Sequence, residues 1–239
     1  MQYPLIHFPH SLHPDLGWDD EPWATIPTLS IAHFHPRSGK HRPETYAKLL
    51  LAGDTLYVLF RVIDRYVKSE CTRYQEPVSD DSCVELFLQP AGSSAYFNFE
   101  FNCGGVMLLY LIRDPGTLAT GLKAFDPVDR EHAEQIAIVS TLPRINRTEI
   151  AGPIEWRLLT SIPLAVLRSY VGLLPVEYGA IWRANLFKCG DKTRHPHWAA
   201  WSDIGDELRF HQPSRFGQFV LTAANSRRIV DKAAARQAM

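Results

Sequence analysis

The stretch Ala95-Tyr-Phe-Asn-Phe-Glu-Phe-Asn-Cys103 alternates apolar and polar residues almost without exception. Successive side chains of a β-strand point to opposite faces, so the pattern predicts a strand with Phe97, Phe99 and Phe101 on one face. Three phenylalanines on one face require a hydrophobic core beneath them. The other face carries phenol, amide and carboxylate groups, which bind hydroxyl-rich ligands: Tyr96, Asn98, Glu100 and Asn102. The same alternation is also typical of any half-solvated antiparallel strand.

The composition is that of an ordinary soluble globular protein. The chain has 239 residues, of which 46% are hydrophobic and 21% charged, and this length suits one large all-β domain or two small ones. A formal net charge of −1 argues against a nucleic-acid or anionic-membrane partner. No apolar run reaches the roughly 18 residues of a transmembrane helix. The first ten residues do not resemble a secretory signal, so we expect a cytoplasmic protein unless a leader has been removed.

The cysteines give no sign of a metal or redox motif. Cys71, Cys83, Cys103 and Cys189 are widely spaced, with no Cys-x-x-Cys pair. We interpret all of them as reduced and structural, since a free buried cysteine behaves as a small hydrophobe. The sequence also lacks a Gly-rich phosphate loop, a His-Glu-x-x-His motif and a Gly-x-Ser-x-Gly motif.

Clusters of β-branched and aromatic residues recur between turn signals, which predicts an all-β antiparallel sandwich. We expect strands at residues 46–51, 55–63, 82–88, 95–102, 106–112, 135–141, 155–163, 180–187, 197–201 and 217–221. Gly53-Asp54 and Gly104-Gly105 are the expected turns between neighbouring strands. Residues 163–170 have helical spacing and predict one short helix that ends at Gly172.

The chain is predicted to form a single domain over residues 1–222. The opening segment, through about Lys40, is rich in Pro, His and Trp and is expected to be irregular and to wrap the sandwich. Residues 223–239 are Ala-rich and basic, and we expect a tail that is either a short helix or disordered.

Several segments, taken in order, resemble the family 9 carbohydrate-binding modules and their bacterial relatives. The resemblance extends from about Trp23 to Leu221. Its stretches are Ala47-Lys-Leu-Leu-Leu51, Thr55-Leu-Tyr-Val-Leu-Phe-Arg-Val-Ile-Asp64, Asp80-Asp-Ser-Cys-Val-Glu-Leu-Phe-Leu88, Tyr96 to Asn102, Ile181-Trp-Arg-Ala-Asn-Leu-Phe-Lys188, Trp198-Ala-Ala-Trp-Ser202 and Phe210-His-Gln-Pro-Ser-Arg-Phe-Gly217. The resemblance implies a β-sandwich that binds sugars without cleaving them.

The resemblance also implies roles for particular residues. Glu85 matches a carboxylate that accepts hydrogen bonds from sugar hydroxyls, and Phe210 matches one of two aromatic rings that stack on the sugar. The other ring would fall at about Val78, which is not aromatic, and Tyr74 is the nearest replacement. Glu100 stands where some members have a basic residue.

A polar patch can also be predicted from the strand pattern alone. In residues 180–187, the alternation leaves Arg183 and Asn185 on the face opposite the core. If this strand neighbours the others, both converge with Glu85 and Glu100, and the Arg183 guanidinium can hold a carboxylate in place for a sugar hydroxyl. A structural ion network is the alternative. Asn98 and Lys188 complete the candidate binding residues.

Aromatic side chains supply the second component of sugar binding, because one face of a pyranose is apolar. Trp198 and Trp201 are three residues apart and therefore lie on opposite faces of a strand. We expect Trp201 in the core and Phe210 against the ligand, with Trp198 in either place. The alternative is that all three only pack.

We predict no metal and no other cofactor, but calcium stays open. His33 with His35, and His195 with His197, lie beside prolines in loop-like sequence and are poor metal candidates. Calcium prefers oxygen ligands, for which four aspartates are available: Asp64, Asp80, Asp81 and Asp203.

The prediction is therefore a non-catalytic module that binds a mono- or oligosaccharide by stacking and hydrogen bonding, with a separate glycoside hydrolase as a candidate partner. One alternative is a glycoside hydrolase that uses Glu85 and Glu100 as its carboxyl pair. Another is a sandwich that contacts other proteins, its polar face merely solvated. A haem-binding variant is disfavoured because there are only three methionines.

Overall fold

The computed structural model describes residues 1–224. The strands are β1 (Gln2–Phe8), β2 (Leu29–Ser30), β3 (His33–Phe34), β4 (Glu44–Ala52), β5 (Thr55–Asp64), β6 (Val67–Ser69), β7 (Cys83–Gln89), β8 (Tyr96–Asn102), β9 (Met107–Asp114), β10 (Ala124–Pro127), β11 (Ala137–Ser140), β12 (Asn146–Ile150), β13 (Ile154–Pro163), β14 (Ile181–Cys189), β15 (Trp198–Ala200) and β16 (Gly217–Ala223). The helices are α1 (Arg130–Ala133) and α2 (Leu164–Val171).

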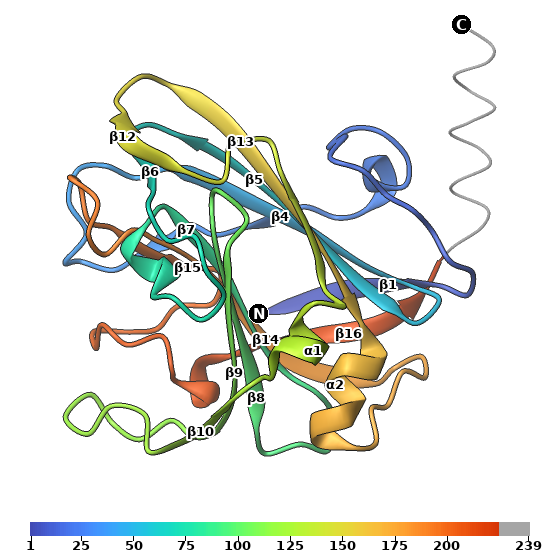
Figure 1. Ribbon diagram of the computed structural model, residues 1–239. Coiled ribbons are helices and arrows are strands. Elements are labelled where there is room, and N and C mark those ends of the chain that lie inside the picture. Colours follow the sequence, from blue (N-terminus) through green and yellow to red (C-terminus); the bar gives the residue numbers. More distant parts are fainter. Residues whose placement is uncertain (225–239) are drawn as a thin grey trace, which may run out of the picture.

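One large sheet curls into a sandwich (Figure 1). Its strand order is β10-β9-β8-β7-β14-β16-β1-β4-β5-β13-β11, and β6 pairs separately with β12. The two halves of this strand order face each other across the main hydrophobic core. Phe99 of β8 and Trp182 of β14 belong to the same buried cluster as Phe60 of β5 and Trp156 of β13. The predicted sandwich is confirmed.

The alternation of β8 places its phenylalanines in this core. Phe97, Phe99 and Phe101 are fully buried, and the rings of Phe99 and Phe101 stack with centroids 6.3 Å apart. The polar face is not solvated, because Asn98 is 1% and Glu100 9% exposed. Other parts of the chain therefore cover the polar face, which excludes a simple half-solvated strand.

All the strands expected from the sequence are present, but the irregular opening segment was only partly predicted. Residues 2–8 form β1, which pairs in parallel with both β16 and β4 and so departs from the expected antiparallel arrangement. Pro4 has no backbone N–H group to donate, which in a sequence argues against a central strand. However, β4 pairs only from Ile6 onward, so Pro4 lies where one edge of β1 has no partner strand and a missing donor is tolerated.

The rest of the opening segment covers the outer face of the β4–β5 region. Trp18 and Trp23 pack with Leu50 and Leu59 in a second buried cluster. The ammonium of Lys48 donates to the carbonyl oxygens of Trp18 and Trp23, both at 2.9 Å, which fixes the segment to β4. The segment therefore wraps the sandwich as predicted.

The short connections follow their sequence signals. Gly53 has φ +53° in the β4–β5 turn, and Gly105 has φ +80° in the β8–β9 hairpin, a backbone region in which glycine carries no steric penalty. Helix α2 lies where helical spacing predicted it and ends before Gly172. No helix in residues 1–224 has the length and apolar character needed to cross a bilayer. Residues 225–239, most of the predicted tail, lie outside the described residues.

Replacing Phe99 with Ala should destabilise the protein by about 3–5 kcal/mol, because it leaves a cavity in the centre of the core. At about 2–4 °C per kcal/mol for a protein of this size, the melting temperature should fall by roughly 6 to 20 °C. Differential scanning calorimetry measures this shift. Phe125→Ala, at a residue that is 40% exposed, is the matched control and should shift the melting temperature far less. Equal shifts in the two variants would contradict the assigned core.

Candidate functional site

The outward faces of β7, β8 and β14 form the floor of a pocket of about 230 Å³. β7 lies between the other two strands, and its register places Glu85 directly opposite both Glu100 of β8 and Phe187 of β14. Loop residues around 191 and 208–211 form the rest of the lining. The complete lining is Ser79, Glu85, Phe87, Glu100, Cys189, Asp191, Trp198, Leu208, Arg209, Phe210 and His211.

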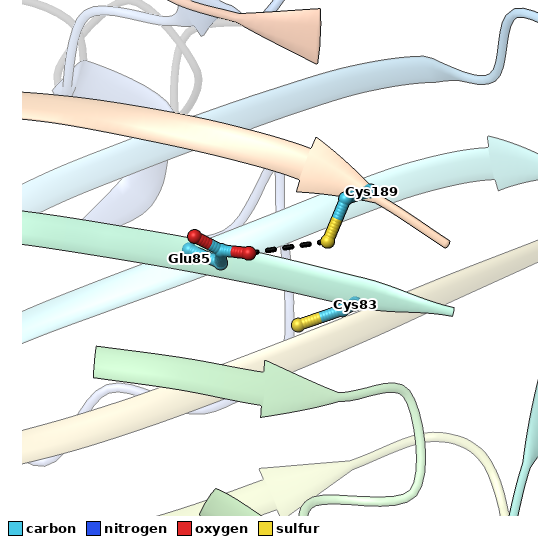
Figure 2. Close-up of side chains that lie close together, drawn as sticks. All are labelled: Cys83, Glu85 and Cys189. Carbon is cyan, nitrogen blue, oxygen red and sulfur yellow. Dashed lines mark hydrogen bonds between the residues drawn. The ribbon is translucent and has the colours of Figure 1, made fainter. Parts of the chain in front are cut away.

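Glu85 and Glu100 are neighbouring buried acids. Glu85 is 2% exposed, and its Oε1 accepts a hydrogen bond of 3.1 Å from the Cys189 thiol (Figure 2). Its Oε2 has no hydrogen-bond partner among the described residues. The Asn98 amide donates to Oε1 of Glu100 at 3.1 Å. Adjacent cross-strand positions thus bring two carboxyl groups to one pocket floor.

Burial controls the protonation of both carboxyl groups. Desolvation, with Cys189 and Glu100 nearby, holds the pKa of Glu85 well above its usual range. Desolvation also raises the pKa of Glu100 to about 7. Asp191, at the rim, has a raised pKa for the same reason, with Asp80 adding to the effect. Near neutral pH the floor therefore holds protons that can be donated to a ligand, as well as lone pairs that accept.

Aromatic rings form the walls. Phe210 stacks on the buried Phe187 with ring centroids 4.1 Å apart and an interplanar angle of 10°, so Phe187 covers one of its two faces. The Trp198 indole N–H donates to Asp191 at 2.7 Å, which fixes the indole at the pocket. Trp201 instead lies in the main core at 5% exposure, as predicted.

Two residues that the resemblance implicated for the second stacking ring do not line this pocket. Val78 is fully buried in a cluster with Cys83 and Cys189. The Tyr74 hydroxyl donates to the Val128 carbonyl at 2.7 Å, and the side chain lines a separate cavity of about 410 Å³. Trp198, supplied from β15, is therefore the partly exposed aromatic ring that accompanies Phe210 in the pocket.

Four of the predicted binding residues do not line the pocket: Asn98, which reaches it only through its hydrogen bond to Glu100, and Arg183, Asn185 and Lys188. The Arg183 guanidinium donates to the Pro213 carbonyl at 2.7 Å and makes no ion pair among the described residues, so the expected clamp on a carboxylate is wrong. Asn185 is buried, donates to the Ser202 carbonyl and accepts from the backbone N–H groups of Leu186 and Ser202. Both residues tie β14 to the loops that follow it.

Lys188 lies on the core side of β14, because its neighbours Phe187 and Cys189 occupy the pocket side. It is fully buried, and its ammonium contacts His197 at 2.8 Å and Asp64 at 3.7 Å. Strand alternation places Lys188 on the same face as Trp182, Ala184 and Leu186, so its assignment to the binding site is wrong; the buried partners that accommodate its charge are distant in sequence.

Several lining residues were not predicted from the sequence, chiefly Asp191, Arg209 and His211. Asp191 follows Gly190 at the end of β14, a turn signal that could have marked it. Arg209 and His211 flank Phe210, which had been identified. His211 contacts the Tyr96 hydroxyl at 2.7 Å, and burial lowers its pKa to about 4, so its ring is neutral at neutral pH.

The four aspartates considered for calcium serve other partners. Asp64 lies 3.7 Å from Lys188, and Asp80 lies 2.8 Å from Lys192. Asp81 accepts from the backbone N–H groups of residues 70 and 71, and Asp203 from that of residue 205. They do not assemble into one oxygen cage among the described residues.

Stability should fall as pH rises because of Glu100. Its folded pKa of about 7 exceeds the ordinary 4.5, so the folded state retains a proton that the unfolded state loses. The contribution of this proton to the free energy of unfolding therefore decreases from pH 5 to 8, by at most about 3 kcal/mol. Urea unfolding of Glu100→Gln across this range should show a smaller decrease than the unmodified protein. Glu134→Gln, at the exposed residue that follows α1, controls for loss of charge, and parallel curves for Glu100→Gln and the unmodified protein would contradict the assignment.

Comparison with known proteins gives a consistent result. The profile of "Carbohydrate-binding family 9" matches residues 24–221. No curated protein matches the chain. Among solved structures, a Bacteroides uniformis protein provisionally described as carbohydrate-binding superposes with a TM-score of 0.78 at 22% identity, covering 92% of this chain and 99% of its own.

Two further structures are of a family 9 carbohydrate-binding module from Caldicellulosiruptor kristjanssonii. In complex with cellotriose it has a TM-score of 0.57 at 16% identity, covering 94% of this chain and 95% of its own. In complex with glucose it has a TM-score of 0.56 at 16% identity, covering 94% and 97%. These likenesses establish the fold. The profile match spans most of the chain, and the chain therefore belongs to carbohydrate-binding family 9.

Proposed function

We propose that the pocket on β7, β8 and β14 binds a mono- or oligosaccharide without cleaving it. One observation carries the proposal: Trp198 and Phe210 line the same 230 Å³ pocket as three acids, Glu85, Glu100 and Asp191. An aromatic ring packs on the apolar face of a pyranose. Carboxyl groups accept from, and when protonated donate to, its hydroxyl groups.

The size of the pocket favours a small occupant. Its volume lies below the roughly 300–1,000 Å³ that is usual for drug-sized ligands. The pocket therefore suits one sugar ring better than an extended chain. We propose that it holds a single terminal unit of the saccharide, with the remainder in solvent.

Family membership and the two ligands of the Caldicellulosiruptor module, glucose and cellotriose, support a sugar ligand. A module without catalytic residues contributes by holding the saccharide. A separate glycoside hydrolase that acts on the same saccharide is the functional partner that we propose.

Protonation argues against the hydrolase alternative. A glycosidase needs one protonated and one ionised carboxyl group. Burial raises the pKa of both Glu85 and Glu100, so the pair lacks a carboxylate that is readily ionised below pH 7. Glu85 is also 2% exposed, which leaves little access for a scissile bond.

Isothermal titration calorimetry and thermal-shift assays with glucose, cellotriose and a panel of other sugars test the binding. A sugar at 100 times its Kd should stabilise the fold by about 2.7 kcal/mol. Phe210→Ala and Trp198→Ala should each weaken binding by about tenfold or more, equivalent to about 1.4 kcal/mol, because each removes a ring from the pocket wall. Phe125→Ala should leave the affinity unchanged. No shift with any sugar would contradict the proposal and favour the protein-contact alternative.

Incubation with cellotriose between pH 5 and 6 should release no glucose, because both glutamates are largely protonated in this range. Chromatography of the products measures this. The proposal fails if glucose is released by the unmodified protein and the release is lost in both Glu85→Gln and Glu100→Gln.

A further inference from the structure

Two cysteines and a glutamate lie close together (Figure 2); Glu85 and Cys189 line the pocket, and Cys83 lies beneath them. Cys83 and Glu85 are two residues apart on β7 and share a face, and the register of β14 places Cys189 directly opposite Cys83. The Sγ atoms of both cysteines and a carboxylate oxygen of Glu85 all lie within 4.8 Å of one another. In residues 1–224, no other group of three His, Cys, Asp or Glu side chains is this close.

These three groups are buried and have no cationic partner. Cys83 is fully buried, Cys189 is 1% exposed, and Glu85 Oε2 makes no hydrogen bond among the described residues. The nearest rim cation, Arg209, donates to the Gly116 carbonyl and lies 3.6 Å from Glu207. A buried, partly unsatisfied carboxyl group costs free energy, so the cluster needs an explanation.

Two further acidic side chains lie beside the cluster. Glu100 lies opposite Glu85 on β8, and Asp191 follows β14 at the rim. The ammonium of Lys188 does not neutralise these acids directly, because it lies on the core side of β14 and contacts His197 and Asp64. A bound cation would pair with these acids and favour the thiolate form of both cysteines.

We propose that Cys83, Cys189 and Glu85 bind one zinc ion at the floor of the pocket. Zinc takes thiolate sulfur at about 2.3 Å and carboxylate oxygen at about 2.0–2.2 Å in tetrahedral geometry, which places its ligand atoms roughly 3.5–4 Å apart. The Cys189 Sγ and Glu85 Oε1 atoms are 3.1 Å apart and all the ligand atoms lie within 4.8 Å of one another, so side-chain shifts of about 1 Å reach this spacing. Two thiolates select zinc over calcium or magnesium, which prefer oxygen.

Metal binding displaces protons from the ligands. Zinc replaces one proton on each thiol, together with any proton on Glu85, so two or three protons are released and the affinity rises with pH. Glu85 and Cys189 line the pocket, so the fourth position is open to a water molecule or to a group in the pocket. Zinc binding by these three side chains requires no sugar, so it can be measured on the protein without a saccharide.

Cobalt titration of the reduced, chelator-free protein tests the site without any variant. Co²⁺ bound by two thiolates gives an intense thiolate-to-cobalt charge-transfer band, and zinc should displace it at one equivalent per chain. Absence of the band overturns the proposal. Surface histidines alone bind cobalt without this band, so they cannot imitate the result.

Cys83→Ser and Cys189→Ser should each abolish the band and weaken zinc binding by about 100-fold or more. Cys71→Ser and Cys103→Ser are the matched controls, because both remove a free cysteine outside the cluster and should retain the band. Circular dichroism verifies that each variant is folded. Retention of the band in folded Cys83→Ser or Cys189→Ser overturns the proposal.

Mass spectrometry of the protein purified without reductant supplies a second measurement. A disulfide between Cys83 and Cys189 that persists under mild reduction would overturn the zinc site, since oxidised sulfurs do not bind the ion. Sugar titrations on zinc-loaded and zinc-free protein separate the two proposals. Metal binding without sugar binding retains the zinc site and rejects the saccharide pocket, and the reverse result does the opposite.

Discussion

The two-residue alternation of β7, β8 and β14 is the constraint on which the rest of this structure depends. Each strand buries one face completely in the core, as Phe99, Leu86 and Trp182 do. Because the period is two, this burial also determines which side chains point to the other face. A shift of one residue in any of these strands would exchange Phe99 for Glu100 and empty both the core and the pocket. The core and the candidate site are therefore specified by the same register.

A buried ionic network connects the two halves of the sandwich. Lys188 of β14 lies 3.7 Å from Asp64 at the end of β5, and His41 contacts the same carboxylate at 2.9 Å. Burial alone would raise the pKa of Asp64, but Lys188 and His41 hold it below its usual value. Buried pairs of this kind repay little of their desolvation cost. The network therefore contributes to the alignment of β5 with β14 more than to net stability.

The pocket differs from this network in that its acids are not paired with basic side chains among the described residues. Its acids lie beside aromatic rings and thiols, and its rim cation is engaged by Glu207. Burial leaves Glu85 and Glu100 protonated where a solvated site would leave them ionised. Protonated carboxyl groups suit the hydroxyl groups of a neutral sugar, and a divalent cation suits the cluster of Cys83, Cys189 and Glu85. Both proposals follow from one property: buried acids and thiols with no cationic partner among residues 1–224.

The sequence alone determined the features that depend on local periodicity. The core strands, the hairpin glycines, helix α2 and the burial of Trp201 all follow from spacing along the chain. The family also follows from the order of its segments. Glu85 and Phe210 could be identified because their segments match those of the family.

Only the tertiary structure decided which side chains meet. Among these contacts are the parallel insertion of β1 between β16 and β4, and the meeting of the core-facing Lys188 with Asp64 and His197. The pairing of Cys83 with Cys189 depends on the register of strands about 100 residues apart in sequence, and that of Trp198 with Asp191 on the path of a loop. Alternation gives each side chain a face, but the partner across that face is set by long-range register and by the path of the loops, which local spacing does not encode.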